Sequence, residues 1–186
     1  MFNETERVVL LDDAGTCIGA EHKARVHHER TPLHLAFSCY LFSPDRTQVL
    51  ITQRAMTKQT WPGVWTNSFC GHPQPFEKIP DAVHRRAAFE LGTQITDLQL
   101  ALPEFRYRAV DASGVVENEI CPVYTAIALT DPVLNPTEVM AARWVPAETL
   151  AETVLSSPAQ FSPWMVLQLQ HLAEQAMFTP ELEMQS

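Results

Sequence analysis

Apolar and polar residues alternate along several short stretches of the chain, a pattern that predicts β-strands. Residues 33–42 (LHLAFSCYLF) are apolar and aromatic enough for a buried strand, and residues 47–53, after a turn at 43–46, are its expected hairpin partner. Further strands are expected at residues 7–12, 104–110, 115–129 and 142–145. The second and third of these flank a turn at 111–114, which predicts another hairpin.

Helical patterns occupy three other stretches of the chain. Residues 79–91 carry a proline in the first turn, place apolar side chains on one stripe and stop at Gly92, which predicts a helix with both ends defined. Two further helices are expected at 146–155 and 162–177. Strands and helices are interspersed without a repeat or a linker. The pattern therefore predicts a single α/β domain with a mixed β-sheet sandwiched between α-helices.

Composition narrows the class of protein. The chain is 46% hydrophobic and 19% charged, which is typical of a globular domain, and its net charge is -9. No basic stripe is present, so we do not expect a nucleic-acid partner. The polar start resembles neither a signal peptide nor a membrane span. The four cysteines are far apart and lack CxxC spacing, so reduced thiols and a cytoplasmic location are expected.

Residues 61–73 (WPGVWTNSFCGHP) stand out because they join two tryptophans, a Pro-Gly turn, a cysteine and a histidine. Large aromatic side chains are costly to leave in a plain surface loop. Cys70 and His72 flank Gly71, a residue type that lets the backbone approach a neighbour closely. A thiol and an imidazole in this setting indicate a functional site rather than a purely structural segment.

Carboxylates and imidazoles elsewhere in the chain form a second group of candidates. Glu117 and Glu119 are two residues apart on a predicted strand and point to the same face. Alone, they are most simply a solvated face, and His34 in an apolar strand is most simply a satisfied core histidine. Brought together with His27 and His72, they would form a nitrogen and oxygen site suited to Mn²⁺, Mg²⁺ or Zn²⁺. Spacing alone leaves both interpretations open.

A loop and the predicted helix after it resemble part of the Nudix box, a motif whose glutamates hold divalent cations against a diphosphate. The matching residues are Gly71, Glu77, Arg85, Glu90 and Gly92. Arg86 and Phe89 stand at two positions where the motif has glutamate, so Glu90 is the helix carboxylate that is kept. Because a pyrophosphohydrolase needs several carboxylates there, the pattern predicts a Nudix fold without the hydrolytic machinery.

Five segments of the chain match the motifs of one known family in the same order and spacing. The match covers most of the chain, from about Lys23 to Trp164. The segments are LHLAF (33–37), WPGVWTNSFCGHP (61–73), FRYR (105–108), VENE (116–119) and FSPW (161–164). Together they closely resemble the type 1 isopentenyl-diphosphate isomerases. The resemblance implies a Nudix-like fold and the interconversion of isopentenyl diphosphate and dimethylallyl diphosphate in isoprenoid biosynthesis.

The resemblance also implies roles for single residues. Cys70 and Glu119 match an essential thiol and carboxylate on opposite faces of the isoprene unit. Tyr107 matches a hydroxyl near that carboxylate, and Trp164 matches an indole over the carbocation. The cations around the diphosphate are expected to be Lys23, Arg54, Lys58 and Arg86. The ligands of a tightly held Mn²⁺, Mg²⁺ or Zn²⁺ are expected to be His27, His34, His72, Glu117 and Glu119.

Two further metal contacts follow from the same resemblance. Glu90 matches a ligand of the Mg²⁺ that accompanies the substrate diphosphate, with the main-chain carbonyl of Cys70 nearby. His28 adjoins His27, so the histidine ligand at this point is one of these two neighbours.

The chemistry explains why these residue types are needed. Moving a double bond by one position requires a proton delivered to one carbon and another removed two carbons away, through a tertiary carbocation. An indole face stabilises a desolvated cation by about 2 kcal/mol. In the family assignment Glu119, coupled to Tyr107 and the metal, delivers the proton, and the Cys70 thiolate removes one. Nearby metals and Lys or Arg side chains are expected to help Cys70 form a thiolate.

In this interpretation residues 1–186 form one isomerase domain. Residues 1–30 are expected to supply an N-terminal strand and an active-site flap that orders over bound metal and substrate, and residues 162–178 a C-terminal helix on the core. The expected partner is a small prenyl diphosphate, with no nucleic acid and no membrane. The protein is expected to be a monomer or a weak homodimer.

Two other functions fit parts of the pattern. A Nudix pyrophosphohydrolase would use the same fold, but Arg86 and Phe89 count against it. A metal-binding or regulatory module without activity would keep the ligands, but metal binding alone needs none of Cys70, Tyr107 and Trp164.

Overall fold

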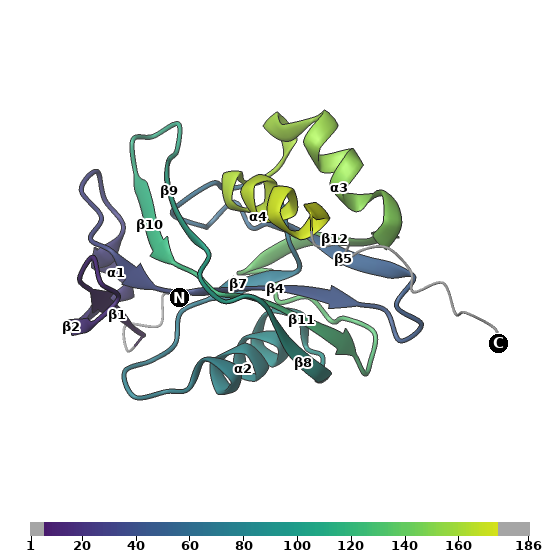
Figure 1. Cartoon of the computed structure of the whole chain (residues 1–186), viewed down its shortest axis with the longest axis horizontal. Helices are drawn as coiled ribbons and strands as arrows, with labels where there is room; N and C mark the ends of the chain where they lie inside the picture. Colours follow the sequence, from purple (N-terminus) through teal and green to yellow (C-terminus); the bar gives the residue numbers. More distant parts are fainter. Residues whose placement is uncertain (1–5, 175–186) are drawn as a thin grey trace.

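The structure, a computed structural model that describes residues 6–174, consists of two β-sheets and helices that cover the larger sheet (Figure 1). The smaller sheet has the order β2-β1-β3-β10-β9, with β1 Arg7–Leu11, β2 Cys17–His22, β3 His34–Leu35, β9 Arg106–Val110 and β10 Val116–Ile120. The larger sheet has the order β12-β5-β4-β11-β8, with β4 Phe37–Phe42, β5 Gln48–Arg54, β8 Ile95–Leu102, β11 Val123–Ala128 and β12 Val139–Pro146. Two short strands extend it, β6 Trp65–Thr66 beside β5 and β7 Phe69–Gly71 beside β4.

Two stretches that the sequence predicts as single strands each pass from one sheet to the other. The first is interrupted at Ala36, between β3 and β4, and the second at Cys121 and Pro122, between β10 and β11. The interruptions lie side by side, because β3 pairs in parallel with β10, and β4 with β11. Pro122 has no N–H to donate to a ladder. The expectation of two unbroken strands, and of one sheet, was therefore wrong at this point.

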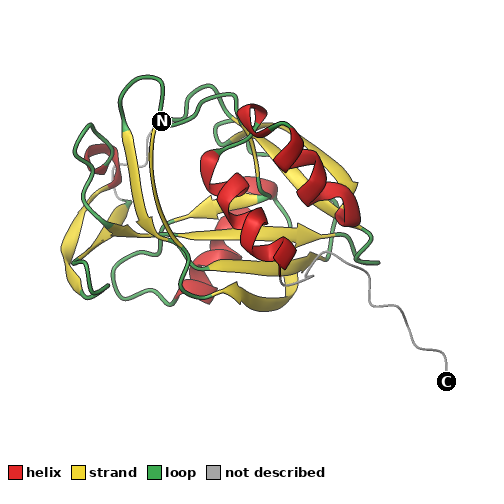
Figure 2. Ribbon diagram, turned by 45° about the horizontal axis from the view of Figure 1, so that its top comes forward, coloured by secondary structure: helices red, strands yellow, loops and turns green. Residues whose placement is uncertain are grey.

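Helices cover both faces of the larger sheet. Helix α2 (Ile79–Leu91) lies on one face, and α3 (Ala147–Ser156) and α4 (Pro163–Glu174) lie across the other (Figures 1 and 2). Every residue of β4 is buried for this reason: Phe37 and Leu41 pack in the core under α2, whereas Tyr40 packs in the core under α3 and α4. The predicted α/β class, with a mixed sheet between helices, is confirmed.

Helix α2 has the ends that its sequence predicts. Pro80 lies in its first turn, and Gly92 ends it in the left-handed conformation, with φ 56°, and donates its N–H to the Ala88 carbonyl. A Cβ at this glycine would lie 2.8 Å from the Val133 carbonyl oxygen, so a side chain would be both strained and crowded.

The later helices also lie close to their predicted positions. Helices α3 and α4 begin within a residue of the expected starts, at Ala147 and Pro163. Residues 175–177 of the second predicted helix, and 175–178 of the expected C-terminal segment, lie outside the described residues, as do residues 1–5 of the expected N-terminal segment. None of the described helices is long and apolar enough to cross a membrane.

Several short or irregular elements escaped the sequence pattern. Strand β8 pairs with β11 through two register shifts, so its buried residues do not alternate cleanly. The four-residue helix α1 (Lys23–Val26) is too short to have a period. The 3₁₀ turn η1 (Pro158–Gln160) likewise precedes α4 without a helical pattern.

Candidate active site

A cavity of about 270 Å³ brings together residues of both sheets and of helices α2 and α4. The expected site residues that line it are Lys23, His27, Arg54, Lys58, Cys70, His72, Arg86, Tyr107, Glu117, Glu119 and Trp164. His34 is fully buried behind it, against Glu119. Glu90 lines a smaller neighbouring cavity that also reaches Cys70. Every expected residue therefore lies in or beside one region.

Three imidazoles and a carboxylate form the densest cluster at this cavity. The ligand atoms of His27, His34, His72 and Glu119 all lie within 4.8 Å of one another. Nε2 of His34 is 3.3 Å, and Nε2 of His72 3.2 Å, from Oε1 of Glu119. Oε2 of Glu117 lies 3.1 Å from Nε2 of His27 at the side of the cluster. The five expected ligands thus converge from segments far apart in the chain.

The cluster fits a divalent metal ion by its own chemistry. Four buried polar atoms lack a hydrogen bond of good geometry within residues 6–174, although two of them face each other at 3.1 Å and a third faces Glu119 at 3.3 Å: His27 Nε2, Glu117 Oε2, His34 Nε2 and His72 Nδ1. Burying such atoms unpaired is costly, so native structures rarely leave them without a partner or an ion. Imidazole nitrogens and carboxylate oxygens are the donors that Zn²⁺ and Mn²⁺ accept.

Burial and neighbouring charges shift the ionisation of these groups in different directions. Burial lowers the pKa of His72 to about 4, so its imidazole is neutral at pH 7, which is the form that ligates a metal. Burial also opposes charge on His34, but the hydrogen bond and the charge of Glu119 outweigh burial and raise the pKa of His34. Burial alone would raise the pKa of Glu119, whereas His34 and His72 hold it well below the usual value. Glu119 is therefore an ionised carboxylate.

The structure also separates the two adjacent histidines. His28 is exposed, and its Nδ1 accepts a hydrogen bond from the main-chain N–H of Arg30 at 3.1 Å. His27 follows helix α1 and turns its ring toward His34, with the ring centroids 5.2 Å apart. The geometry places His27, not His28, beside the other candidate ligands.

The Cys70 thiol is held in a polar niche on strand β7. Its S–H donates to Oδ1 of Asn67 at 3.3 Å, and the hydroxyl of Ser38, its register partner on β4, lies 3.3 Å from the sulfur. Burial raises the pKa of Cys70 to about 11, and these hydrogen bonds and Arg54 lower it less than burial raises it. The side chains of the site therefore favour the thiol, and the expected help from a neighbouring cation is small.

Aromatic rings close the cavity next to this thiol. Trp164 is 3% exposed and packs edge-to-face on Trp61, with centroids 5.4 Å apart, and against Tyr107 at 5.8 Å. The guanidinium of Arg54 lies 5.2 Å from the Trp164 ring, and its Nε also donates to the carbonyls of Thr60 and Trp61. Trp61, expected to have only a packing role, thus packs directly on the expected indole of the site.

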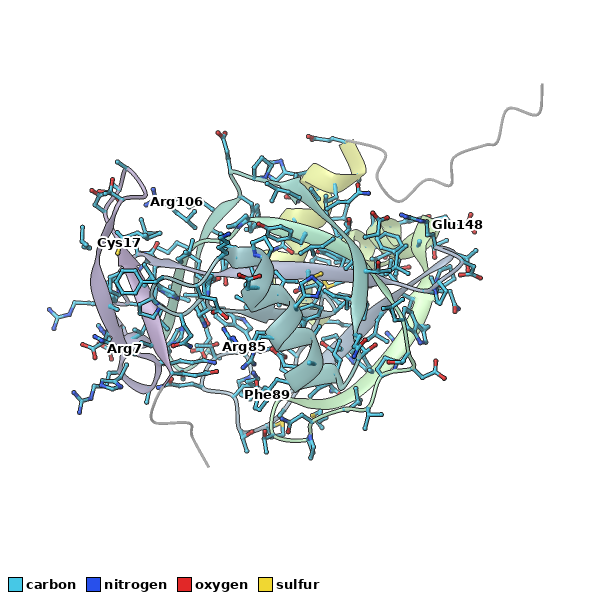
Figure 3. All side chains as sticks on the ribbon, turned by 90° about the horizontal axis from the view of Figure 1, so that it is seen from below. Arg7, Cys17, Arg85, Phe89, Arg106 and Glu148 are labelled. Atoms are coloured by element: carbon cyan, nitrogen blue, oxygen red, sulfur yellow. The ribbon has the colours of Figure 1, made fainter. Side chains whose placement is uncertain are left out.

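Three of the four expected diphosphate cations are paired with carboxylates. Nη2 of Arg86 is 2.6 Å from Glu90 and 3.0 Å from Glu138. Lys58 pairs with Glu138, and Lys23 lies 2.8 Å from Glu6. The positive charges therefore gather in one network with internal counter-ions. Figure 3, which looks onto α2, shows Phe89 on this helix, and its ring packs on the guanidinium of Arg86, one turn earlier, at 4.9 Å.

Several residues of the site were not predicted from the sequence. They are Glu6, Ser38, Thr60, Asn67 and Glu138. Thr60 donates to Oε1 of Glu117 at 2.6 Å and so orients that carboxylate. Ser38 did carry a signal, because it is a small polar residue between apolar and aromatic neighbours in residues 35–42. Asn67 lies within residues 61–73, the stretch that already stood out, but between two other polar residues, Thr66 and Ser68. Glu6 and Glu138 lie in ordinary polar segments and carried none.

Comparisons with known proteins agree with this geometry. The NUDIX domain family matches residues 32–165. An isopentenyl-diphosphate Delta-isomerase of Paenarthrobacter aurescens is 55% identical over 93% of this chain and 94% of its own length. One of Agromyces mediolanus is also 55% identical, over 91% of this chain and 82% of its own length.

Solved structures show the same fold at lower identity. DR0079 from Deinococcus radiodurans is 17% identical and superposes with a TM-score of 0.67, covering 89% of this chain and 98% of that one. A MutT NUDIX hydrolase from Burkholderia pseudomallei is 20% identical, with a TM-score of 0.55, covering 74% of this chain and 96% of that one. From its fold and its close relatives together, the chain belongs to the type 1 isopentenyl-diphosphate isomerase family of the Nudix superfamily.

Proposed function

We propose that the protein interconverts isopentenyl diphosphate and dimethylallyl diphosphate in isoprenoid biosynthesis. The observation that carries this proposal is the single cavity lined by a thiol, a carboxylate and an indole beside a cluster of cations: Cys70, Glu119, Trp164 and the diphosphate candidates. Relatives that are 55% identical along nearly the whole chain carry the same activity in their names.

Two proton transfers complete the reaction. In the direction of dimethylallyl diphosphate, protonated Glu119 gives its proton to the terminal carbon of the double bond, and the Cys70 thiolate takes a proton from the carbon two positions away. The substrate thus gains and loses one proton, and the double bond moves by one position. The enzyme is then left with a Glu119 carboxylate and a Cys70 thiol, the forms that the free site favours, so one proton passes from Cys70 back to Glu119 before each turnover. A carboxyl group with a lowered pKa is a strong acid once protonated, and a thiolate with a raised pKa is a strong base.

The aromatic rings protect the cation formed between the two transfers. Trp164 presents a buried indole face at the cavity, and Tyr107 packs against it beside Glu119. Such a face attracts a desolvated cation by about 2 kcal/mol. Closing the cavity with these rings also excludes water, which would otherwise add to the carbocation.

The histidine and glutamate cluster holds a divalent ion in this proposal. His27, His34, His72, Glu117 and Glu119 supply the ligands, and the ion is Mn²⁺, Mg²⁺ or Zn²⁺. When bound, it supplies positive charge beside Glu119. Thr60 keeps Glu117 oriented, and the strand pairing of β3 with β10 keeps His34 against Glu119.

The cation network binds the diphosphate. Lys23, Lys58 and Arg86 already lie together, neutralised by Glu6 and Glu138, and a diphosphate competes with these carboxylates for them. Arg54 is the fourth cation, placed against Trp164 by its bonds to the loop after β5. Glu90, 4% exposed and bonded to Arg86, is the proposed ligand of the Mg²⁺ that accompanies the diphosphate, with the Cys70 main-chain carbonyl.

Further proposals concern the whole chain. Residues 1–30 act as an active-site flap, since α1 and its flanks bring Lys23 and His27 to the cavity. Residues 162–178 act as a helix that packs on the core and supplies Trp164. We also propose that residues 1–186 form one cytoplasmic isomerase domain, which is a monomer or a weak homodimer.

A direct assay tests the activity. The purified protein, reduced and supplied with Mg²⁺, is incubated with isopentenyl diphosphate, and acid-labile dimethylallyl diphosphate is measured. Phosphate release is followed in parallel, because a pyrophosphohydrolase would release it and an isomerase would not. Absence of the allylic product under metal-replete conditions would overturn the proposal.

A further inference from the structure

We propose that Asn67 is a positioning residue that fixes the Cys70 thiol and the Trp164 indole relative to each other through one amide oxygen. The inference rests on the proposed function, because the two groups it joins are those that flank the isoprene unit. Asn67 itself is fully buried and reaches neither the cavity nor the diphosphate cations.

The orientation of the Asn67 amide is determined by its NH₂ group. Nδ2 donates to the carbonyl of Cys39 at 3.1 Å and to the carbonyl of Phe69 at 2.9 Å. A flipped amide would place its oxygen against both carbonyl oxygens and lose two hydrogen bonds, so the observed orientation is strongly favoured. Strands β4 and β7 therefore direct Oδ1 to the opposite side.

That oxygen accepts hydrogen bonds from donors in different parts of the fold. Nε1 of Trp164 donates at 3.0 Å, the Cys70 thiol at 3.3 Å and the hydroxyl of Thr66 at 2.9 Å. The indole has one N–H and no acceptor, so this contact satisfies its single polar group, while Trp61 and Tyr107 pack against its ring. Trp164 belongs to helix α4 and Cys70 to strand β7. Both donate to the same atom, Oδ1 of Asn67.

The consequence is a constraint on catalysis rather than on binding. A thiol must meet one carbon of the substrate while the indole covers the next, and misplacement by about 1 Å costs about 10²-fold in rate. The bonds of the Asn67 side chain lead to β4, β7, Thr66, Cys70 and Trp164, and none leads to a diphosphate cation. Arg54, the cation that lies against Trp164, is held by its own bonds to the carbonyls of Thr60 and Trp61. Loss of the oxygen should therefore lower kcat and leave diphosphate affinity unchanged.

Two substitutions separate positioning by the oxygen from a structural role of the NH₂ group. Asn67→Ala removes both. Asn67→Asp keeps an oxygen facing the thiol and the indole, and its second oxygen, protonated at this buried position between the Cys39 and Phe69 carbonyls, replaces the two donors by one. We expect N67A to lower kcat by about 30-fold to 100-fold and to leave the KM and the Kd for inorganic pyrophosphate within about 3-fold. We expect N67D to recover at least about 5-fold of the lost kcat. A kcat of N67D that is no higher than the kcat of N67A would overturn the proposal.

A spectroscopic readout reports the contact itself. The chain has four tryptophans, so a ¹H–¹⁵N spectrum contains four indole N–H signals, and W164F identifies the one from Trp164. We expect this signal to move upfield and to exchange faster with solvent in N67A, and to stay near its original position in N67D. An unchanged signal in N67A would overturn the proposal.

Thr52→Val is the matched control. The Thr52 hydroxyl donates to the main-chain oxygen of Asn67 at 3.0 Å, so T52V removes a buried bond at the same residue without touching the side-chain amide. We expect T52V to lower stability and to keep kcat within about 2-fold. A fall in kcat as large as in N67A would contradict a specific role for the amide oxygen.

The wild-type protein keeps the proposal testable if neither Asn67 variant folds. Its Trp164 indole proton should exchange slowly, and exchange as fast as that of an exposed indole would overturn the proposal. A wild-type protein that folds but does not turn over isopentenyl diphosphate would overturn the proposed function instead. The indole signal would still report whether Asn67 holds Trp164.

Discussion

His34 and Glu119 are direct partners in the register between the parallel strands β3 and β10, and Nε2 of His34 lies 3.3 Å from Oε1 of Glu119. A strand of only two residues thus serves to place one imidazole against one carboxylate. Both side chains are almost completely buried, and the described chain leaves Nε2 of His34 without a hydrogen bond of good geometry. If this cluster holds the proposed cation, the cation should contribute to the stability of the protein.

Metal removal should therefore lower both activity and stability. Dialysis against a chelator is expected to abolish isomerisation and to lower Tm by about 5–10 °C, because a ligand present at about 100 times its Kd stabilises by about 2.7 kcal/mol. Addition of Mn²⁺, Mg²⁺ or Zn²⁺ should restore Tm, as followed by calorimetry. A Tm that is identical with and without the chelator would argue against a metal in this cluster.

Cys70→Ala should abolish turnover without unfolding the protein. The variant loses a group that exchanges a proton with the substrate, so kcat is expected to fall by about 10³-fold or more. Cys17→Ala is the matched control, because Cys17 is exposed on the outer hairpin of the smaller sheet (Figure 3). Comparable activity of C70A and C17A would remove Cys70 from the mechanism.

Lys58→Met should weaken substrate binding more than turnover. The ammonium of Lys58 lies at the cavity and pairs with Glu138, and a hydrogen bond to a charged group contributes about 1.5–3 kcal/mol. KM should rise by about 10-fold to 100-fold, with kcat within about 5-fold. Arg46→Met, at an exposed ion pair with Asp97, should leave both constants unchanged. Steady-state kinetics measure both constants for the two variants. An unaltered KM in K58M would contradict the proposal that Lys58 binds the diphosphate.

Glu138→Gln should change how stability depends on acid pH. Burial alone would raise the pKa of Glu138, but Lys58 and Arg86 lower it from 4.5 to about 2. A carboxyl group with a lowered pKa contributes stability above its unfolded-state pKa, and the contribution is lost as pH falls toward 2. The free energy of unfolding of the wild type should therefore fall by up to about 3 kcal/mol more than that of E138Q between pH 5 and pH 2.

Urea unfolding across this pH range measures the difference. At pH 6 the variant should be the less stable protein, because Lys58 and Arg86 lose a charged partner. Parallel acid profiles for the two proteins would show that Glu138 titrates normally.

Local signals were sufficient where a structure depends on neighbours in the chain. Helix α2 begins and ends where its proline and glycine predict, and the β4–β5 hairpin follows from its alternation and turn. The combined motifs predicted the candidate site residues as a set, and the structure brings these residues into one region. The sequence did not reveal that residues 33–42 divide at Ala36, because both halves are equally apolar and the division depends on Pro122, distant in the chain.

The sequence by itself therefore determined the α/β class, most helices and strands, the family, and the identity of the thiol, imidazole and carboxylate candidates. Only the tertiary structure decided how they meet: His27 rather than His28 in the cluster, Glu138 and Glu6 as counter-ions, and one Asn67 oxygen between Cys70 and Trp164. The physical reason is that periodicity and capping are properties of adjacent residues. Convergence depends instead on the register between distant strands and on which buried polar atoms satisfy one another.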